Sequence, residues 1–582
     1  MRSLLLSSLC ALLIALQPVV AVWPIPKKFK TGNTTLFLHQ NLEIKYNDNL
    51  TQYTFGYEAA TFDSHDIVRA GVSRALSTLF GEQFVPWMLH KPGDKFEPDV
   101  NGNLKWIKML EITQTGKDDS EKILKPKAGE VDESYNLTLS ADGEVKLTAV
   151  SSIGVLRGLE TFIQLFYQHS AGTFWYTPYA PVEIEDEPKF DHRGLLIDTS
   201  RHFFPVDHIL RTIDALAWNK MNRLHFHVTD SQSWPLEIPS MPELHKKGAH
   251  HPAFTYSPTD VDRIFKYGAM RGVQVYFEID MPGHIGSVAL SHPELITAWN
   301  ARPYDAYCAQ PPCGNFKLNS TKVDEFVKRL FDDLFPRISK YTSYFHTGGD
   351  EIKYKAYTLD DTVKSDKEDV LKPLLQKFFD KSHKQVRDAK LTPIVWEESV
   401  EKYNLALEKD VIVQTWTGDG KVQNVTSKGY GVIDSNVNYW YLDCGRGQWV
   451  LFDNNEYARG WPFNDWCGPT KSWQRIYSHD PRANLTAEQA KLVLGGEVAA
   501  WSETIDPLNF DPLVWPRASA AGEALWSGNK LESGQNRSQL EVAPRLFEWR
   551  ERMVARGIRA APLTQLFCTQ RSPEECLWEN PN

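Results

Sequence analysis

From about Arg193 onward, short apolar runs alternate regularly with amphipathic segments. Such alternation is typical of parallel strands joined by helices. We identify eight apolar runs, at 194–198, 223–228, 273–279, 344–347, 393–396, 411–416, 431–441 and 492–501. This number of strand–helix units predicts a (β/α)8 barrel, with a doubly wound open sheet as the structural alternative. No glycine-rich phosphate loop follows the first run, which disfavours a nucleotide-binding sheet.

The segments between the runs carry helix-boundary signals. Apolar residues recur at helical spacing over 206–217, directly after Pro205. Residues 257–260, Ser-Pro-Thr-Asp, form a capping sequence with proline at the first helical position. Another amphipathic segment, with Val327 and Leu334 on one face, is expected to end at Pro336.

The residues before the first run predict a smaller domain of mixed α and β structure. We expect a helix over 64–80, a β-hairpin over 135–147 and a second helix over 152–167. An acidic, proline-containing stretch then marks a boundary. We therefore predict an N-terminal α+β domain over 22–187 and a barrel domain with a C-terminal extension over 188–582.

Within the first region, residues 92–133 are polar and show no clear period. We interpret them as a long loop or a processed insertion.

Residues 1–21 have the features of a secretory signal peptide. Arg2 supplies a positive start, residues 4–16 are almost wholly apolar, and Ala21 offers a small residue at a plausible cleavage point. This stretch is too short for a transmembrane helix, and no later run is long enough. We therefore predict a secreted, extracellular protein that has no membrane anchor.

The cysteine and glycosylation patterns agree with secretion. Once Cys10 leaves with the signal, six cysteines remain, and an even number favours disulfides. Pairing sequence neighbours joins Cys308 to Cys313, Cys444 to Cys467 and Cys568 to Cys576, while other pairings stay open. Glycan acceptor sequences occur at Asn33, Asn49, Asn136, Asn319, Asn424, Asn484 and Asn536.

Charge excludes one class of partner. The formal net charge is −10, so no basic surface for nucleic acid is indicated. The 19 tryptophans and 22 tyrosines suit stacking on sugar rings, although large cores also use tryptophan.

Polar side chains gather where the runs end, which is where barrels place their chemistry. The fourth run ends in Gly348-Gly349-Asp350-Glu351. By itself this sequence is more typical of a solvated acidic turn, and the two acids share a pocket only where the strand bends or stops. The other ends add Asp230, Glu278, Asp280, His284, Trp396, Glu397, Glu398, Trp416, Tyr441, Asp443, Trp501 and Glu503.

Convergent acids and tryptophans at one mouth predict a pyranose pocket. Aromatic faces bind the C–H surface of a sugar, and carboxylates and an arginine bind its hydroxyls. Arg193 is the candidate arginine, although it lies where its strand begins. No lysine stands at these ends, which argues against Schiff-base chemistry.

Two other hydrolase chemistries have weaker support in the sequence. His225 and His227 project from one face of the second strand and are compatible with a zinc-dependent barrel hydrolase. They precede the strand end, so we expect packed or hydrogen-bonding histidines instead. A Ser/His/Asp hydrolase is disfavoured because no Gly-x-Ser-x-Gly elbow appears at a strand end.

At this point the motifs resemble those of family 20 glycoside hydrolases, the β-N-acetylhexosaminidases, and the length and secretion signals look most like the fungal enzymes. His346-Thr-Gly-Gly-Asp350-Glu351 is similar to the family signature. The remaining motifs stand in the family's order: Arg193-Gly194, His227-x-x-Asp230, Met281-Pro-Gly-His284, Trp396-Glu397, Tyr441-x-Asp443 and Gly495-Gly-Glu-x-x-x-Trp501-x-Glu503. The resemblance covers nearly the whole chain after the signal.

The resemblance implies a retaining hydrolase without an enzyme nucleophile, in which the substrate's 2-acetamido oxygen forms an oxazolinium ion. It implies Glu351 as general acid and base, Asp350 as the residue that orients the acetamido group, and Tyr441 as its hydrogen-bond donor. It implies sugar binding by Arg193, Trp396, Trp416, Asp443, Trp501 and Glu503, and supporting roles for Asp230 and His284.

Further expectations follow from these roles. The pKa of Glu351 should be raised by burial and a neighbouring negative charge, whereas Asp350 should stay ionised. A disulfide at Cys444 should restrain the loop after the seventh run. The resemblance implies substrates that end in N-acetylhexosamine, chito-oligosaccharides among them, no cofactor, no metal, and a homodimer. A carbohydrate-binding protein with an inert acid pair is the non-enzymatic alternative.

Overall fold

The computed structural model describes residues 22–50, 63–81, 84–450, 463–571 and 573–576. The expected signal peptide over 1–21 lies outside the described residues.

A closed barrel of parallel strands confirms the main prediction and excludes the open sheet. Each strand pairs with the next, and the last, β17, pairs with the first, β8. The barrel strands are β8 (His192–Asp198), β9 (Arg223–Thr229), β10 (Gln274–Ile279), β13 (Tyr344–His346), β14 (Thr392–Trp396), β15 (Ile412–Thr415), β16 (Gly431–Asp434) and β17 (Val493–Ala500). They coincide with the eight apolar runs apart from their ends.

The seventh run is the one that the structure divides. Strand β16 stops at Asp434, and Asn436 caps a short helix, α10 (Val437–Trp440). The Asn436 side chain accepts a hydrogen bond from the Asn438 backbone N–H, which starts a helix in place of a longer strand. Tyr441 and Asp443 therefore reach the barrel mouth from a turn after this helix.

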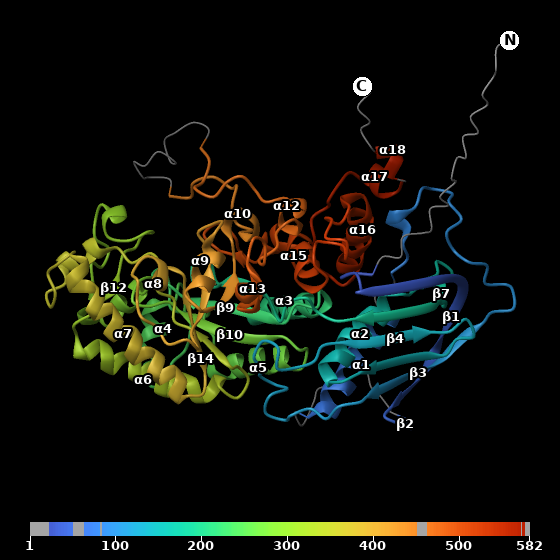
Figure 1. Cartoon of the computed structure of the whole chain (residues 1–582), viewed down its shortest axis with the longest axis horizontal. Helices are drawn as coiled ribbons and strands as arrows, with labels where there is room; N and C mark the ends of the chain where they lie inside the picture. Colours follow the sequence, from blue (N-terminus) through green and yellow to red (C-terminus); the bar gives the residue numbers. More distant parts are fainter. Residues whose placement is uncertain (1–21, 51–62, 82–83, 451–462, 572, 577–582) are drawn as a thin grey trace, which may run out of the picture.

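Helices surround the barrel, as Figure 1 shows. They are α3 (Val206–Trp218), α4 (Glu243–Gly248), α5 (Pro258–Ala269), α6 (Thr321–Ile338), α7 (Glu368–Asp388), α8 (Glu398–Glu401), α9 (Lys421–Ser427), α12 (Trp473–Tyr477), α13 (Ala487–Lys491), α14 (Phe510–Val514), α15 (Arg517–Trp526) and α16 (Gln539–Ala555). Helices α17 (Leu566–Thr569) and α18 (Pro573–Cys576) lie away from the barrel, and α17 contacts Trp87–Leu89 of the N-terminal region. The capping box at Ser257 and Asp260 is present at the start of α5. The expected end at Pro336 is wrong, because α6 continues through this proline to Ile338.

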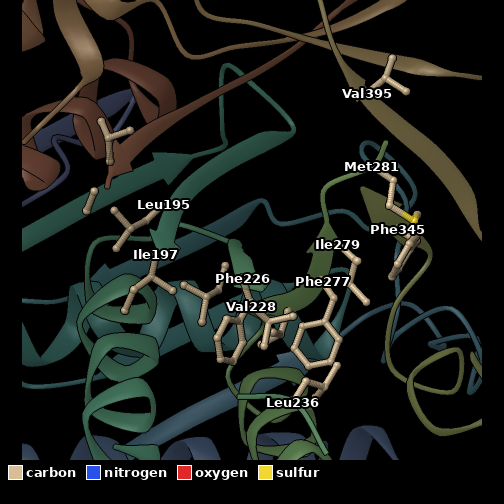
Figure 2. Packing of buried hydrophobic residues seen from close by; sticks show 14 of the residues in the cluster. Leu195, Ile197, Phe226, Val228, Leu236, Phe277, Ile279, Met281, Phe345 and Val395 are labelled. Atoms are coloured by element: carbon tan, nitrogen blue, oxygen red, sulfur yellow. The ribbon is translucent and has the colours of Figure 1, made fainter. Parts of the chain in front are cut away.

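Outward-facing strand residues form the main core with these helices. Leu195 and Ile197 of β8, Phe226 and Val228 of β9, and Phe277 of β10 alternate along their strands and are fully buried. Figure 2 shows these side chains packed together in one apolar layer. The strand residues between them point into the barrel, which leaves that interior free for polar groups.

A second sheet lies beside the barrel, with strand order β2-β1-β3-β5-β4-β7-β6. Its strands are β1 (Lys28–Tyr46), β2 (Asn49–Leu50), β3 (Trp106–Gln114), β4 (Tyr135–Leu139), β5 (Val145–Ala149), β6 (Tyr167–Gln168) and β7 (Trp175–Asp186). Helices α1 (Ser64–Gly81) and α2 (Ser152–Gln164) share an apolar cluster with it. The predicted hairpin is confirmed, because β4 and β5 pair antiparallel.

Strand β3 corrects the interpretation of residues 92–133 as a loop. It pairs in parallel with β1 on one side and β5 on the other, so it is an interior strand of the sheet. Ile107, Leu110 and Ile112 are buried, while polar residues between them obscure the alternation in the sequence.

Buried ion pairs join the sheet region to the base of the barrel. Glu133 contacts both Arg193 (2.6 Å) and Arg157 (2.8 Å). Asp186, at the end of β7, binds Lys220 (2.8 Å). Burial opposes ionisation of Glu133, but the two arginines outweigh it and lower the pKa to about 2.

Three disulfides are present, with the sequence-neighbour pairing: Cys308–Cys313, Cys444–Cys467 and Cys568–Cys576. The seven glycan acceptor asparagines are all exposed. Among the helices that the structure describes, none is long and apolar enough to cross a bilayer.

Candidate active site

The acid pair lies on a sharp turn at the end of β13. Gly348 and Gly349 have φ angles of +68° and +98°, and Glu351 itself has a φ of +49°. A Cβ on Gly348 would lie 1.8 Å from the Asp280 Oδ1 atom. Only glycine fits this backbone at this distance. The turn breaks the strand's alternation, so Asp350 and Glu351 both reach the same pocket.

This pocket has a volume of about 470 Å³ and lies at the carboxyl ends of the strands. It brings together nine of the residues that the sequence predicted: His284, Asp350, Glu351, Trp396, Trp416, Tyr441, Asp443, Trp501 and Glu503. Asp230 is fully buried and contacts His284. Residues that the sequence did not indicate also line it: Arg201, Tyr304, Ala309, Gln310, Lys353, Gln448, Trp449, Val450 and Trp466.

Glu351 is held by a histidine from the neighbouring strand. Its Oε2 atom lies 3.2 Å from His284 Nε2, and the other ring nitrogen of His284 lies 3.2 Å from Asp230 Oδ1. Burial opposes the charged form of His284, but the negative charges of Asp230 and Asp350 outweigh it and raise its pKa well above the usual value. The Glu351 side chain remains 31% exposed, so its carboxyl group is accessible to a ligand in the pocket.

Asp350 lies beside a second carboxyl group, that of Asp280. Burial, together with the negative charge of Asp280, raises the pKa of Asp350 well above its usual value. Burial also raises the pKa of Asp280 to about 7. Both shifts favour the protonated forms, which opposes the expectation that Asp350 stays ionised. The Oδ1 atom of Asp350 is buried and meets no hydrogen-bond donor among the described residues.

Aromatic rings form the pocket wall. Trp396 and Trp501 lie with ring centroids 6.1 Å apart, and Trp416 stacks on Tyr441 at 6.1 Å. Trp466 meets Trp416 edge-on at 5.9 Å and is 55% exposed at the rim. Flat apolar faces arranged around carboxylates match the amphipathic surface of a pyranose.

Buried carboxylates hold two of these rings by their indole N–H groups. Trp396 Nε1 donates to Glu278 Oε1 at 2.7 Å, and Trp416 Nε1 donates to Glu398 Oε2 at 3.0 Å. Burial, with a contribution from Asp350, raises the pKa of Glu398 to about 8. The wall is therefore fixed by hydrogen bonds as well as by packing.

Arg201, not Arg193, is the arginine of the pocket. Arg193 lies at the opposite end of β8, where it is fully buried and bonds to Phe190, Lys220 and Glu133. Arg201 follows the carboxyl end of β8 and contacts Asp198 (3.0 Å) and Asp230 (2.8 Å). Its position three residues beyond the carboxyl end of the first strand is the sequence signal that could have identified it.

The other end of the pocket is acidic. Burial and the charge of Glu503 raise the pKa of Asp443 well above its usual value. Asp443 Oδ1 is buried without a hydrogen-bond donor among the described residues, whereas Glu503 accepts a bond from Gln310 at 2.8 Å. Unpaired buried carboxylate oxygens are suited to accept hydrogen bonds from ligand hydroxyls.

Two disulfides frame the mouth. The Cys444–Cys467 bond packs with Tyr441 and Trp396, and Trp466 precedes its second cysteine. The disulfide expected after the seventh run is therefore present. The Cys308–Cys313 bond closes the loop that carries Gln310.

The histidines of the second strand do not fit a metal site. Both ring nitrogens of His225 lie within 3.1 Å of the carboxylates of Glu278 and Glu497. Both nitrogens of His227 lie within 3.0 Å of Glu278 and Asp230. Each ring is thus fully engaged by hydrogen bonds, and this geometry disfavours the zinc-hydrolase alternative.

Comparison with known protein families agrees with the geometry. A model described as glycosyl hydrolase family 20, catalytic domain, matches residues 190–529, which contain every pocket residue. The chain belongs to glycosyl hydrolase family 20. A second model, described as beta-acetyl hexosaminidase like, matches residues 22–165 of this family 20 enzyme.

Relatives of this family 20 enzyme extend over most of its length. It is 38% identical over 590 residues to a Beta-hexosaminidase of Arthroderma benhamiae, covering 95% of this chain and 96% of that protein. It is 34% identical to a Chitooligosaccharidolytic beta-N-acetylglucosaminidase of Ostrinia furnacalis, covering 76% and 74%. The structure of Flavobacterium johnsoniae chitobiase matches with a TM-score of 0.70 at 26% identity, covering 93% of this chain and 73% of that one.

Proposed function

We propose that this enzyme removes terminal β-linked N-acetylglucosamine and N-acetylgalactosamine from the non-reducing ends of oligosaccharides. The supporting observation is the pocket in which Asp350 and Glu351 face an aromatic wall from one turn. The acids and rings converge on one pocket at the barrel mouth, which supports binding of a terminal sugar.

Glu351 is proposed as the general acid and then the general base. It is the more exposed of the two acids, and His284 contacts its carboxyl group. When Glu351 gives its proton to the leaving oxygen, a positively charged His284 stabilises the carboxylate that remains. The same carboxylate then accepts a proton from the attacking water.

Asp350 is proposed to act on the substrate's acetamido group. It is buried beside Asp280, and its free Oδ1 atom is suited to accept the acetamido N–H. That hydrogen bond orients the acetamido oxygen toward the anomeric carbon and favours the positive charge of the oxazolinium ion. Tyr441 is proposed to bind the acetamido oxygen, and Trp396, Trp416 and Trp501 to enclose the methyl group and the ring.

Arg201, Asp443 and Glu503 are proposed to bind the sugar hydroxyls. Arg201 replaces the Arg193 of the sequence-based assignment. Chito-oligosaccharides are the proposed natural substrates, and the Ostrinia furnacalis relative is a chitooligosaccharidolytic enzyme by name.

Secretion, glycan attachment, a homodimer and processing within 92–133 remain proposals. The exposed acceptor asparagines and the three disulfides support passage through a secretory route. Size-exclusion chromatography with light scattering tests the dimer, and intact mass of the secreted protein tests the processing and the glycans.

The decisive test compares two aryl substrates. A nitrophenyl β-N-acetylglucosaminide should be hydrolysed with retention of configuration, whereas the matched β-glucoside without the acetamido group should not. A thiazoline mimic of the oxazolinium ion should inhibit competitively. Sugar binding without turnover would indicate a carbohydrate-binding protein, and a trappable glycosyl–enzyme bond would indicate a protein nucleophile.

A further inference from the structure

The interior of the barrel contains a series of carboxylates and imidazoles that leads from Glu278 to Glu351. Below this series, His225 joins Glu278 (2.9 Å) to Glu497 (3.1 Å), which lies deeper in the barrel. Glu278 contacts His227 (2.7 Å), and His227 contacts Asp230 (3.0 Å). His284 completes the series between Asp230 and Glu351, at 3.2 Å from each.

Glu278 is the residue of this series that also supports the aromatic wall. Its Oε2 atom serves His225 and His227, while its Oε1 atom accepts the Trp396 N–H at 2.7 Å. His346 Nδ1 also lies 3.3 Å from the Oε1 atom, but it accepts the Gly348 N–H and so does not donate to Glu278. The donors to Glu278 lie on β9 (His225 and His227) and β14 (Trp396), so one carboxylate of β10 links three barrel strands.

The hydrogen-bond chemistry requires Glu278 to be ionised. A carboxylate only accepts hydrogen bonds, and the groups around Glu278 are an indole N–H and imidazole nitrogens. A neutral imidazole donates from one nitrogen only, yet both nitrogens of His227 face carboxylate oxygens. Burial opposes the charge of His227, but Glu278 and Asp230 outweigh it and raise the pKa to about 10. Glu278 and His227 are thus a charged, mutually dependent pair.

We propose that Glu278 is a positioning residue for hydrolysis, in which one buried carboxylate aligns Trp396 of the sugar pocket and the His227–Asp230–His284 series behind the general acid. This inference rests on the proposed function. Glu278 contacts no ligand itself, and it acts through these two groups. It links Trp396, in the wall proposed to enclose the acetamido group, to the series of residues that ends in the contact of His284 with Glu351.

Glutamine at this position tests the coupling. The variant Glu278→Gln keeps the size of the side chain, but its amide has one acceptor oxygen and one donor NH2 group. Whichever way the amide turns, a donor faces either the Trp396 N–H or the two histidines. The chain provides a matched control in Glu497→Gln, because Glu497 is equally buried and bonds His192, His225, Tyr276 and Gln414, yet contacts neither Trp396 nor His227.

Two readouts separate positioning from mere stability. For Glu278→Gln, kcat should fall about ten- to a hundredfold, and the loss should be larger for chitobiose than for an aryl glycoside whose leaving group needs less protonation. The inhibition constant of the thiazoline should rise about tenfold. Glu497→Gln should lower the melting temperature comparably, with less than a threefold change in either kinetic readout.

Equal kinetic losses in the two variants would overturn the proposal, and so would a Glu278→Gln enzyme that is only less thermostable. If Glu278→Gln does not fold, Glu278→Asp provides the same comparison, since it keeps the charge and withdraws the oxygens from Trp396 and His227. For Glu278→Asp, the dependence of kcat on the pKa of the leaving group should then be steeper than for the wild type. An unchanged dependence would refute the inference. Inactivity of the wild-type protein on every N-acetylhexosaminide would instead refute the proposed function, and the inference with it.

Discussion

The Nε2 atom of His284 lies 3.2 Å from the Oε2 atom of Glu351, and this contact distinguishes the two adjacent acids of the pocket. Asp350 is farther from the same nitrogen, at 3.9 Å, and is associated with Asp280 instead. One acid therefore has a cationic partner and a side chain that is 31% exposed, and the other has an acidic partner and a side chain that is 13% exposed. This difference in surroundings underlies the proposed division of roles.

Glu351→Gln should reduce kcat by about two to four powers of ten, because the amide cannot donate a proton to the leaving oxygen. The loss should be smallest for substrates with acidic phenol leaving groups, which depart with little protonation. Steady-state kinetics over a series of aryl glycosides measures this dependence. A near-wild-type rate on chitobiose would contradict the assignment.

Arg201→Lys should weaken substrate binding, whereas Arg193→Lys should lower the stability of the fold. Lysine at 201 loses the planar fork that contacts Asp198 and Asp230, so KM should rise about tenfold or more. Lysine at 193 loses the bonds to Phe190 and Lys220 far from the pocket, so it should lower the free energy of unfolding by about 1–3 kcal/mol and leave KM unchanged. Thermal melts and Michaelis–Menten kinetics on the pair check this, and an increase in KM for Arg193→Lys would contradict it.

Asp280 should make the stability of the enzyme fall as pH rises. Its pKa is about 7 in the fold, above the value of 3.8 for an unperturbed aspartate, so the folded state binds more protons between these values. This stability is fully present below about pH 4 and is lost as the pH rises through 7, with a slope of at most about 1.4 kcal/mol per pH unit.

Melting temperatures from pH 4 to 8 test this dependence. Asp280→Asn keeps an acceptor oxygen for the Gly349 N–H but removes the titrating group, so its melting temperature should gain relative to wild type as the pH rises. Parallel curves for the two proteins would show that Asp280 does not retain a proton in the fold.

Removal of the Cys444–Cys467 disulfide should weaken binding of longer substrates. The bond closes a segment with a sequence separation of 23 and fixes the loop beside Trp466, whereas Cys568–Cys576 lies in the C-terminal helices α17 and α18. Cys444→Ser with Cys467→Ser should raise KM for chitotriose more than for an aryl monosaccharide. The control, Cys568→Ser with Cys576→Ser, should leave both KM values unchanged. Similar changes in the two variants would contradict a role of the Cys444–Cys467 bond at the pocket mouth.

Much of the fold was predictable because it depends on local patterns. Eight apolar runs with intervening amphipathic segments require parallel strands buried on both faces, and the barrel satisfies that requirement. Errors occurred where a local rule was overridden. Pro336 lies inside α6 because neighbouring apolar residues bury that helix, and β3 was missed because polar residues interrupt its alternation.

That acids and tryptophans follow the strand ends could be predicted, since position along a strand is a property of the chain. Which arginine reaches the pocket depends on the folded barrel, because Arg193 lies near the start of β8 and Arg201 follows its carboxyl end. Only the tertiary structure also decided how Asp350 and Glu351 differ. Their surroundings depend on Asp280 and His284, which belong to another strand end and approach the pair only when the barrel closes.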